Sequence, residues 1–326
     1  MATAPGLKSL HRKGCTSLRT IPRDAGGSQF PTQRDIIGRL SATSPELTAN
    51  AVEADLLYLA PDSTLNRRFV APGIDENTGR FEPHRVLIRN GRPVQDQFTL
   101  DTHGFTLARH HSRVADFTDK AAVDEIYPGE IVEIVKTLTG ADLVVPLAAI
   151  VRTADATAGG PTQPPASDAH VDFTPARAVR YAEQVYRKHS PDGSGFKRFI
   201  ASSCWRAFSD PPQDWPLAVC DGRSVRADEG TANVMVVVDA LPSREAMYGP
   251  LAGEDAMPAA SVFHFNPNHR WWYFPNMTRD EVLLLKFFDS DQSRAWRTPH
   301  TAFRDPTYAD ATTRRSIEFR SFAFFI

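Results

Sequence analysis

The sequence is poor in cysteine and in net charge, and each shortage excludes a class of protein. Only three cysteines occur among 326 residues, Cys15, Cys204 and Cys220. Their odd number argues against a disulfide framework and their spacing matches no cysteine-based metal site, so we expect reduced thiols. A formal charge of −2 gives no basic field for nucleic acid, and we expect no nucleic-acid partner.

Long apolar runs and nucleotide-binding motifs are also missing from the sequence. No apolar run approaches the ~20 residues that cross a bilayer, and the segment from Met1 to Lys13 lacks the apolar stretch of a signal peptide. We therefore expect a cytoplasmic protein without a membrane partner. Neither a Gly-x-Gly-x-x-Gly nor a Walker motif occurs, which argues against the common nucleotide-binding folds.

The sequence does contain a long succession of β-type segments. Residues 1–45 are rich in Gly, Pro, Ser, Thr and Arg without a sustained period, and they predict an N-terminal arm that is partly disordered. Residues 46–326 predict a single domain in which strands follow one another with few helices between them. This order favours a mainly β fold with flanking helices, a sandwich or barrel of the jelly-roll kind, over alternating βαβ units.

Helical periodicity is confined to three segments. Ala121–Thr139 has apolar residues at helical spacing, with an interruption at Pro128-Gly129. Ala176–His189 and Arg279–Phe288 are predicted as two further helices. A β-hairpin is expected around the turn signal Asn90-Gly91.

One long loop separates two strand-like regions. The segment 153–167 consists almost wholly of Ala, Thr, Gly, Pro, Ser and Gln. Long loops in compact domains are often functional, so this segment could be a lid over a site. An idle surface insertion explains the composition equally well.

A pair of metal-ligating residue types follows this loop. Alternate side chains of an extended segment share a face, so His170 and Asp172 would project together as an imidazole and a carboxylate. With a second histidine from far along the chain, they form the 2-His-1-carboxylate site of non-haem Fe(II) oxygenases. His300 lies in the right chain order for that role. His-x-Asp alone is a weak signal, because the chain has ten histidines.

The last strand carries a candidate anion site. Alternation predicts that one face presents Arg314, Ser316, Glu318 and Arg320, and that Arg315 lies on the other. A guanidinium and a hydroxyl on one face match a terminal carboxylate. Taken alone, the strand is more simply a basic edge paired with surface acids. The upstream histidines and aspartate favour the binding role.

Several sequence motifs follow one another along the chain in the order found in a known protein family. They are His170-x-Asp-Phe-Thr-Pro, Cys204-Trp-Arg206, Phe265-Asn-Pro-Asn-His-Arg-Trp-Trp-Tyr-Phe-Pro, Pro299-His-Thr-Ala-Phe and Arg314-x-Ser-Ile-Glu-x-Arg320. From about Arg85 to the C-terminus, the sequence resembles the hydroxylase/desaturase family of fungal secondary metabolism. That family includes the gibberellin desaturase and is related to the CmcJ-type protein of cephamycin methoxylation.

The resemblance implies an Fe(II)- and 2-oxoglutarate-dependent oxygenase that uses O2 and is built on a double-stranded β-helix, a cupin-like jelly roll. Such an enzyme abstracts a hydrogen from a small-molecule substrate, giving hydroxylation, desaturation or oxidative ring closure. Carried over by position, the implied iron ligands are His170, Asp172 and His300. The implied 2-oxoglutarate contacts are Arg314 and Ser316, with Arg320 as a second cation.

Substrate contacts are harder to assign. Phe173 and Trp205 adjoin the motifs and are candidates. Arg206 could bind an anionic group of substrate or cosubstrate, or form a structural ion pair with Asp221 or another acid. The family pattern places Asn and Val where this chain has Ser203 and Cys204, so the substrate class stays open.

Two other functions also stay open. A cupin-type metalloprotein with non-oxidative chemistry could use the same three ligands, but it would not need Arg314 and Ser316. A non-catalytic partner protein in a biosynthetic complex could retain the fold without turnover. Oligomeric state is not predicted by any feature of the sequence.

Overall fold

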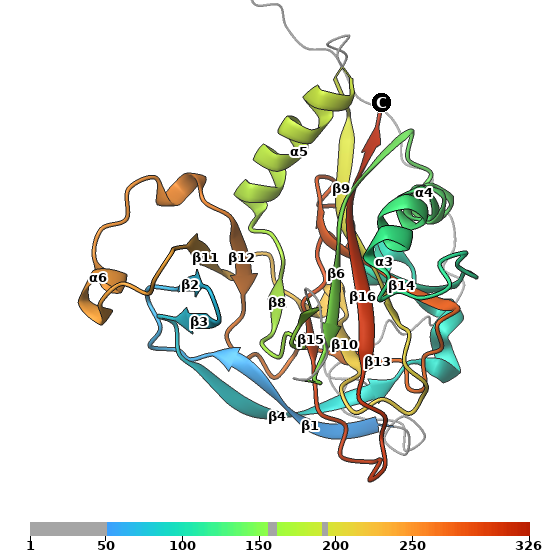
Figure 1. The fold of residues 1–326 in the computed structure, drawn as a ribbon, viewed down its shortest axis with the longest axis horizontal. Coiled ribbons are helices and arrows are strands. Elements are labelled where there is room, and N and C mark those ends of the chain that lie inside the picture. Colours follow the sequence, from blue (N-terminus) through green and yellow to red (C-terminus); the bar gives the residue numbers. More distant parts are fainter. Residues whose placement is uncertain (1–50, 156–161, 191–194) are drawn as a thin grey trace, which may run out of the picture. The chain divides into compact units, whose positions relative to one another are not determined.

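The strands of the described chain form two β-sheets (Figure 1). The computed structural model describes residues 51–155, 162–190 and 195–326, all within a unit that begins at Pro45. The larger sheet has ten strands and the smaller has six. The predicted mainly β class is therefore confirmed. The arm expected at residues 1–45 lies outside the described residues.

The larger sheet collects strands from distant parts of the chain. Its order is β1-β4-β13-β10-β15-β8-β12-β11-β2-β3. The bounds are β1 Ala51–Leu59, β2 Arg67–Ala71, β3 Ile74–Asn77, β4 Phe81–Asn90, β8 His170–Val171, β10 Leu217–Cys220, β11 Thr231–Val237, β12 Ala259–Val262, β13 Trp271–Tyr273 and β15 His300–Ala302. The short strands β8 and β15 are neighbours near the middle of this order.

The smaller sheet has the order β5-β14-β9-β16-β6-β7. Its bounds are β5 Phe105–Arg109, β6 Leu143–Thr153, β7 Thr162–Gln163, β9 Arg198–Ala207, β14 Glu281–Asp289 and β16 Arg315–Phe325. The last strand, β16, is antiparallel to both of its neighbours, β9 and β6. Two long partners hold β16 on both edges, which fixes its register against the rest of the sheet.

Four α-helices and three 3-10 helices flank the sheets. They are α3 Leu100–His103, α4 Lys120–Thr139, α5 Pro175–His189, α6 Arg244–Tyr248, η1 Arg92–Gln97, η2 Gly222–Ser224 and η3 Glu254–Ala256 among the described residues. The prediction of a helix at α5 is confirmed, and its start follows a known rule: Thr174 Oγ1 accepts a hydrogen bond from Arg177 N, with Pro175 in the first turn. No helix in the described ranges has the length and apolar character needed to cross a membrane.

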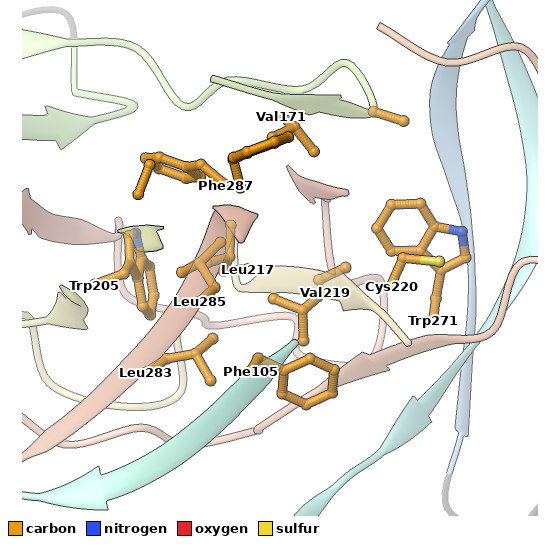
Figure 2. Packing of buried hydrophobic residues seen from close by; sticks show 14 of the residues in the cluster. Phe105, Val171, Trp205, Leu217, Val219, Cys220, Trp271, Leu283, Leu285 and Phe287 are labelled. Carbon is orange, nitrogen blue, oxygen red and sulfur yellow. The ribbon is translucent and has the colours of Figure 1, made fainter. Parts of the chain in front are cut away.

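The main hydrophobic core lies between the two sheets (Figure 2). Val171 and Val219 of the larger sheet belong to the same buried cluster as Trp205, Leu283 and Phe287 of the smaller sheet. A second cluster covers the opposite face of the smaller sheet, where α4 packs Tyr127 and Ile131 against β16. The smaller sheet is therefore buried on both faces.

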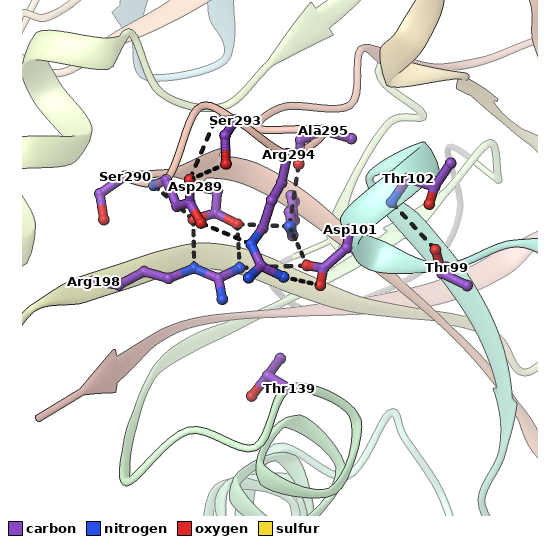
Figure 3. Close-up of polar contacts among 12 residues, drawn as sticks. Thr99, Asp101, Thr102, Thr139, Arg198, Asp289, Ser290, Ser293, Arg294 and Ala295 are labelled. Atoms are coloured by element: carbon purple, nitrogen blue, oxygen red, sulfur yellow. Dashed lines mark hydrogen bonds and ion pairs between the residues drawn. The ribbon is translucent and has the colours of Figure 1, made fainter. Parts of the chain in front are cut away.

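A buried ion cluster joins α3, β9 and the end of β14 (Figure 3). Lys286 and Asp289 are both 0% exposed, and Lys286 Nζ lies 2.6 Å from Asp289 Oδ2. Arg198 donates to both oxygens of Asp289. Asp101 pairs with Lys286, Arg198 and Arg294 around this centre. The charges compensate one another, as buried charges must.

The prediction of a helix at Arg279–Phe288 is wrong, because this segment forms β14. All nine residues of β14 are buried. Leu283 and Leu285 face the core between the sheets, while Val282 and Leu284 face the core under α4. A strand covered on both faces has no polar alternation, so its sequence cannot be told from a buried helix by period.

Two smaller predictions are also corrected. The chain forms no hairpin at Asn90-Gly91: β4 pairs with β1 and β13, and Asn90 Oδ1 accepts from Arg92 N as the chain enters η1. Helix α4 continues through Pro128 without a break. Proline removes one hydrogen bond to the carbonyl of Asp124, but Asp124 is exposed and water can replace the donor.

Candidate metal centre and anion pocket

His170 and His300 meet across two short neighbouring strands. Each is the first residue of its strand, β8 and β15, and the antiparallel register places them directly opposite one another. Their ring centroids are 4.4 Å apart. The sheet topology thus brings together two imidazoles that are remote in the sequence.

Asp172 completes a cluster of three metal-ligating groups. It follows β8 directly and precedes the helix cap Thr174. Its Oδ1 lies 3.5 Å from His170 Nε2 and 3.4 Å from His300 Nε2. One ligand atom from each residue falls within 4.8 Å of the others. Two imidazole nitrogens and one carboxylate oxygen form the donor set that the sequence predicted.

Backbone carbonyls orient both imidazoles. His170 Nδ1 is 2.7 Å from Asp168 O, and His300 Nδ1 is 3.1 Å from Thr298 O. A carbonyl accepts only, so each Nδ1 carries the hydrogen and each Nε2 points to Asp172. Metal-ligating histidines are commonly oriented in this way, by a hydrogen bond from the other ring nitrogen.

The charges around the cluster are strongly coupled. Burial alone would lower the pKa of His170, but Asp168 and Asp172 together raise it to about 9. Burial would raise the pKa of Asp172, but Arg320 and the two histidines hold it well below its usual range. The cluster therefore keeps a carboxylate charged among cationic partners. A bound metal cation would take the place of the proton on His170 Nε2.

Arg314 and Ser316 lie together at the start of β16, and both are 1% exposed. Arg314 Nη1 donates to Trp215 O at 2.6 Å, and its guanidinium carbon lies 5.6 Å from the centre of the Trp205 ring. Arg314 Nε and Ser316 Oγ are buried without a hydrogen-bond partner. Burial lowers the pKa of Arg314 to about 9. Buried donors without an acceptor are rare and need an explanation. An anion that binds here in the working enzyme would supply the missing acceptor.

A small cavity connects the anion pocket with the histidines. Its lining residues are Arg152, Ala166, His170, Trp205, Leu217, His300, Ala302, Arg314 and Glu318. Arg152 pairs with Glu318 at 3.2 Å. Within this lining, that pairing leaves Arg314 as the cation without a carboxylate partner. The cavity therefore presents an arginine without a carboxylate partner beside the metal-ligating cluster.

The predicted faces of the last strand agree with the structure. Ser316 and Glu318 face the interior between the sheets, Arg315 is exposed, and Ile317 packs under α4. Arg320 shares the interior face but does not line the cavity. Its Nη2 lies 2.6 Å from Asp172 Oδ2 and 3.1 Å from Glu318 Oε1. Arg320 thus pairs with the acidic residue of the metal-ligating cluster, and its role as a second cosubstrate cation stays a prediction.

Arg152 is the second arginine of the cavity, and sequence reasoning missed it. It lies on β6, and Ser316 is its partner in the register with β16. The sequence indicates a strand there, but which residue of one strand lies beside which residue of another depends on register. No local motif marks Arg152.

The three predicted substrate contacts fall in different places. Trp205 lines the cavity. Phe173 lies further out, with its ring 5.8 Å from that of Phe287, which itself stacks on His300 at 5.5 Å. Both aromatic rings are therefore near the metal-ligating cluster.

Arg206 points the other way, so the prediction that it binds an anion at the site is corrected. It is 0% exposed and lies on the α4 side of β9. Its Nε donates to Tyr127 Oη at 2.9 Å and its Nη1 to Arg279 O at 2.7 Å. The alternative of an ion pair with Asp221 is also wrong, because Asp221 pairs with Arg223 and Arg270.

Part of the predicted loop 153–167 approaches the site. Thr153 ends β6, Thr162–Gln163 forms β7, and residues 156–161 lie outside the described residues. Ala166 lines the cavity, and its carbonyl accepts a 2.7 Å hydrogen bond from Ala302 N. Whether the loop acts as a lid stays a prediction.

Comparison with known proteins places this geometry in a family. A family model described as an oxidoreductase/YMDC permease-like domain matches residues 56–324. The Fe(II)/2-oxoglutarate-dependent dioxygenase nvfI of Aspergillus novofumigatus is 32% identical over 83% of this chain and 96% of its own length. The hydroxylase/desaturase efuI of Hormonema carpetanum is 31% identical over 75% and 85% of the two chains. The hydroxylase/desaturase CTB9 of Cercospora beticola is 33% identical over 75% and 78%.

A solved structure agrees with these sequence relationships. The iron and alpha-ketoglutarate-dependent endoperoxidase NvfI superimposes with a TM-score of 0.71 at 29% identity. The match covers 85% of this chain and 99% of that one, and it confirms the predicted jelly-roll fold. The chain thus belongs to the family of fungal Fe(II)/2-oxoglutarate-dependent dioxygenases and hydroxylase/desaturases, and it is an oxidoreductase of that family.

Proposed function

We propose that His170, Asp172 and His300 hold the iron of this oxygenase and that Arg314 and Ser316 bind the terminal carboxylate of 2-oxoglutarate. The substrate is a small-molecule intermediate of secondary metabolism, which the enzyme hydroxylates, desaturates or closes oxidatively into a ring. The observation that carries the proposal is the convergence of two Nε2 atoms on Asp172 Oδ1, at 3.4 and 3.5 Å, beside the guanidinium of Arg314, whose buried Nε has no hydrogen-bond partner.

The donor set fits Fe(II). Two imidazoles and one carboxylate are the ligands of the facial site that leaves positions open for cosubstrate and O2. The hydrogen bonds from both Nδ1 atoms to Asp168 O and Thr298 O fix the rings with Nε2 toward a common point. The cysteines of the described chain, Cys204 and Cys220, are buried and free, and neither belongs to the cluster.

The anion pocket fits a dicarboxylate that reaches the metal. Arg314 Nε and Ser316 Oγ are buried donors without a partner, and a carboxylate accepts from both kinds of group. The same cavity is lined by both histidines. A molecule with one carboxylate on Arg314 can therefore present its other end to the metal position, as 2-oxoglutarate must.

The protein's own part in the reaction is binding, orientation and exclusion of water. Iron with 2-oxoglutarate supplies the activation of O2 when both are bound. Arg314 and Ser316 hold the far carboxylate, while Trp205 and Leu217 provide apolar walls that shield the pocket. Phe287 stacks on His300 and restricts rotation of that ring. Arg320 supports the ionised state of Asp172.

We infer that aromatic groups beside the metal-ligating cluster form the substrate side. Phe173 contacts Tyr181 as well as Phe287, with ring centroids 6.1 and 5.8 Å apart. Aromatic walls favour a substrate with an apolar ring system. We infer that Phe173 contributes to the substrate pocket and that Trp205 acts chiefly on the cosubstrate side, against Arg314.

Succinate formation tests the proposal. The purified chain is supplied with Fe(II), ascorbate and 2-oxoglutarate, with and without candidate natural-product substrates, and succinate is measured. We expect iron-dependent succinate that rises with an accepted substrate and is lost in His300→Ala. An iron-loaded protein that neither binds 2-oxoglutarate nor forms succinate with any of a broad substrate set would contradict the proposal.

A further inference from the structure

The two carboxylate oxygens of Asp172 have different surroundings. Oδ1 is the atom that both histidine Nε2 atoms approach. Oδ2 points the other way and lies 2.6 Å from Arg320 Nη2. Oδ2 has no aligned hydrogen-bond donor among the described residues, so the ion pair with Arg320 is the contact that holds it. The carboxylate is thus oriented with one oxygen inward and one outward.

Arg320 is itself held in place by neighbours on the smaller sheet. Its Nη2 lies 3.1 Å from Glu318 Oε1 on the same strand. Glu318 accepts from Nε and Nη2 of Arg152 at 3.3 and 3.2 Å. The side chains of Arg152 and Glu318 are 13% and 11% exposed, and that of Arg320 is 29% exposed. Four alternating charges therefore run from Asp172 to the wall of the anion pocket.

We propose that Arg320 is a positioning residue that reserves Oδ2 of Asp172, so that this carboxylate offers a single oxygen to the metal. The inference rests on the proposed role of Asp172 as an iron ligand. Carboxylates bind metals through one or two oxygens. Three protein ligands leave three positions open for cosubstrate and O2, and a second oxygen from Asp172 would occupy one of them. Arg320 keeps that position free for the 2-oxoglutarate chelate.

The proposal predicts that substitution of Arg320 affects the binding of metal, 2-oxoglutarate and succinate differently. Without Arg320, Oδ2 is released and Asp172 can turn both oxygens to the metal. Metal binding should then be preserved, because a ligand atom is gained. Chelation by 2-oxoglutarate should weaken, because it now competes with Oδ2. Binding of succinate should be unaffected, because succinate has the terminal carboxylate for Arg314 but lacks the keto acid that chelates the metal.

The test uses the full chain with Mn²⁺ in place of Fe(II), so that ligand binding is measured without turnover. Calorimetry gives the affinities for Mn²⁺, 2-oxoglutarate and succinate in the wild-type protein, Arg320→Gln and Arg320→Lys. Arg315→Gln, a change on the exposed face of the same strand, is the matched control. Lysine keeps the positive charge near Asp172, but its ammonium ends a shorter and differently shaped side chain than the guanidinium whose Nη2 contacts both Asp172 and Glu318.

We expect Arg320→Gln to bind Mn²⁺ at least as tightly as the wild type and to keep its succinate affinity. Its 2-oxoglutarate affinity should fall by about 10- to 100-fold, a loss of the size that removal of other outer-shell partners causes in metal affinity or activity. Arg320→Lys should show a smaller loss of the same pattern, and it carries the test if the glutamine variant does not fold. Arg315→Gln should match the wild type.

Two results would overturn the inference. Unchanged 2-oxoglutarate affinity in Arg320→Gln would mean that Asp172 needs no support. Parallel loss of succinate and 2-oxoglutarate would mean that Arg320 contacts the cosubstrate carboxylate directly. Failure of the underlying function is recognised separately, because the wild-type protein would then bind Mn²⁺ no better than His170→Ala does.

Discussion

His170 and His300 form the sole residue pair between β8 and β15 in the described chain, and they face each other with ring centroids 4.4 Å apart. The pairing of these two short strands therefore sets the spacing of the two imidazoles. Each strand has a further neighbour that anchors it, β12 beside β8 and β10 beside β15. The metal-ligating cluster consequently depends on the middle of the larger sheet, which is more rigid than a loop.

Loss of a proposed ligand should remove activity without unfolding the chain. His170→Ala, Asp172→Ala and His300→Ala should each abolish iron-dependent succinate formation and reduce metal affinity by more than about 100-fold, beyond the effect of losing an orienting partner. The melting temperature should change little, because the large core is untouched. His84→Ala, which removes a histidine stacked on Phe265, is the control and should retain activity. Near-normal turnover in any of the three variants would show that the ligand set is wrong.

The buried ion cluster should be important for stability. Asp289 is 0% exposed and compensates Lys286 and Arg198. Asp289→Asn leaves the buried ammonium of Lys286 with only the more distant, half-exposed Asp101 as a charge partner, so we expect a loss of about 3–5 kcal/mol in the free energy of unfolding. Chemical denaturation measures the change. Asp291→Asn, in the neighbouring turn, should be nearly silent because its pair with Arg294 is at the surface. Equal stability of Asp289→Asn and the wild type would mean that water reaches the cluster.

The sequence was informative where function constrains short motifs. The metal-ligating cluster could be predicted from His170-x-Asp172 and His300 because alternation in an extended segment and family order both pointed to them. The faces of β16 could be predicted because Arg314, Ser316 and Glu318 alternate with Arg315 and Ile317. Period-2 patterning is visible in a strand when its two faces meet different surroundings.

Features that depend on register or on burial of both faces were not predictable. β14 lacks alternation because both of its faces are covered, so it resembled a helix. Arg206 and Arg320 both lie near motifs, but their contacts differ. Arg206 donates a hydrogen bond to Tyr127, whereas Arg320 forms an ion pair with Asp172. Tertiary packing decides which face of β9 presents Arg206. It also sets the register of β16 against its neighbouring strands, and the local sequence does not encode either feature.

Acid should selectively weaken the contact between α4 and the segment before it. Glu130 is 2% exposed and accepts from Ser112 Oγ at 2.6 Å and Arg113 N at 2.8 Å. Burial would raise the pKa of Glu130, but these hydrogen bonds lower it below 4.5. A carboxyl with a depressed pKa in the folded state adds stability that is fully present above its unfolded pKa and is lost as the pH falls through the folded value.

Glu130→Gln should therefore lower the free energy of unfolding by about 1.5–3 kcal/mol at neutral pH, the range for hydrogen bonds to a charged group. The difference from the wild type should begin to shrink as the pH falls below about 4.5. It should be smallest below the depressed folded pKa of Glu130, where both chains are uncharged at this position. Denaturation curves between neutral and acidic pH measure both effects. Glu125→Gln, on the exposed face of the same helix, is the control. A difference that does not depend on pH would assign the loss to packing.

Arg314 is the residue whose substitution should act on the cosubstrate alone. Its Nε has no partner and its neighbour Ser316 has a free hydroxyl, so both await an anion. Because a charge-assisted contact in a buried pocket is strong, Arg314→Gln should raise the 2-oxoglutarate KM by roughly tenfold to a thousandfold. Metal affinity without cosubstrate should hardly change. Arg314→Lys should recover only part of the loss, since an ammonium cannot replace the planar fork. Arg315→Gln, exposed on the opposite face, should be silent; sensitivity at Arg315 with a silent Arg314 would place the anion on the other side of the strand.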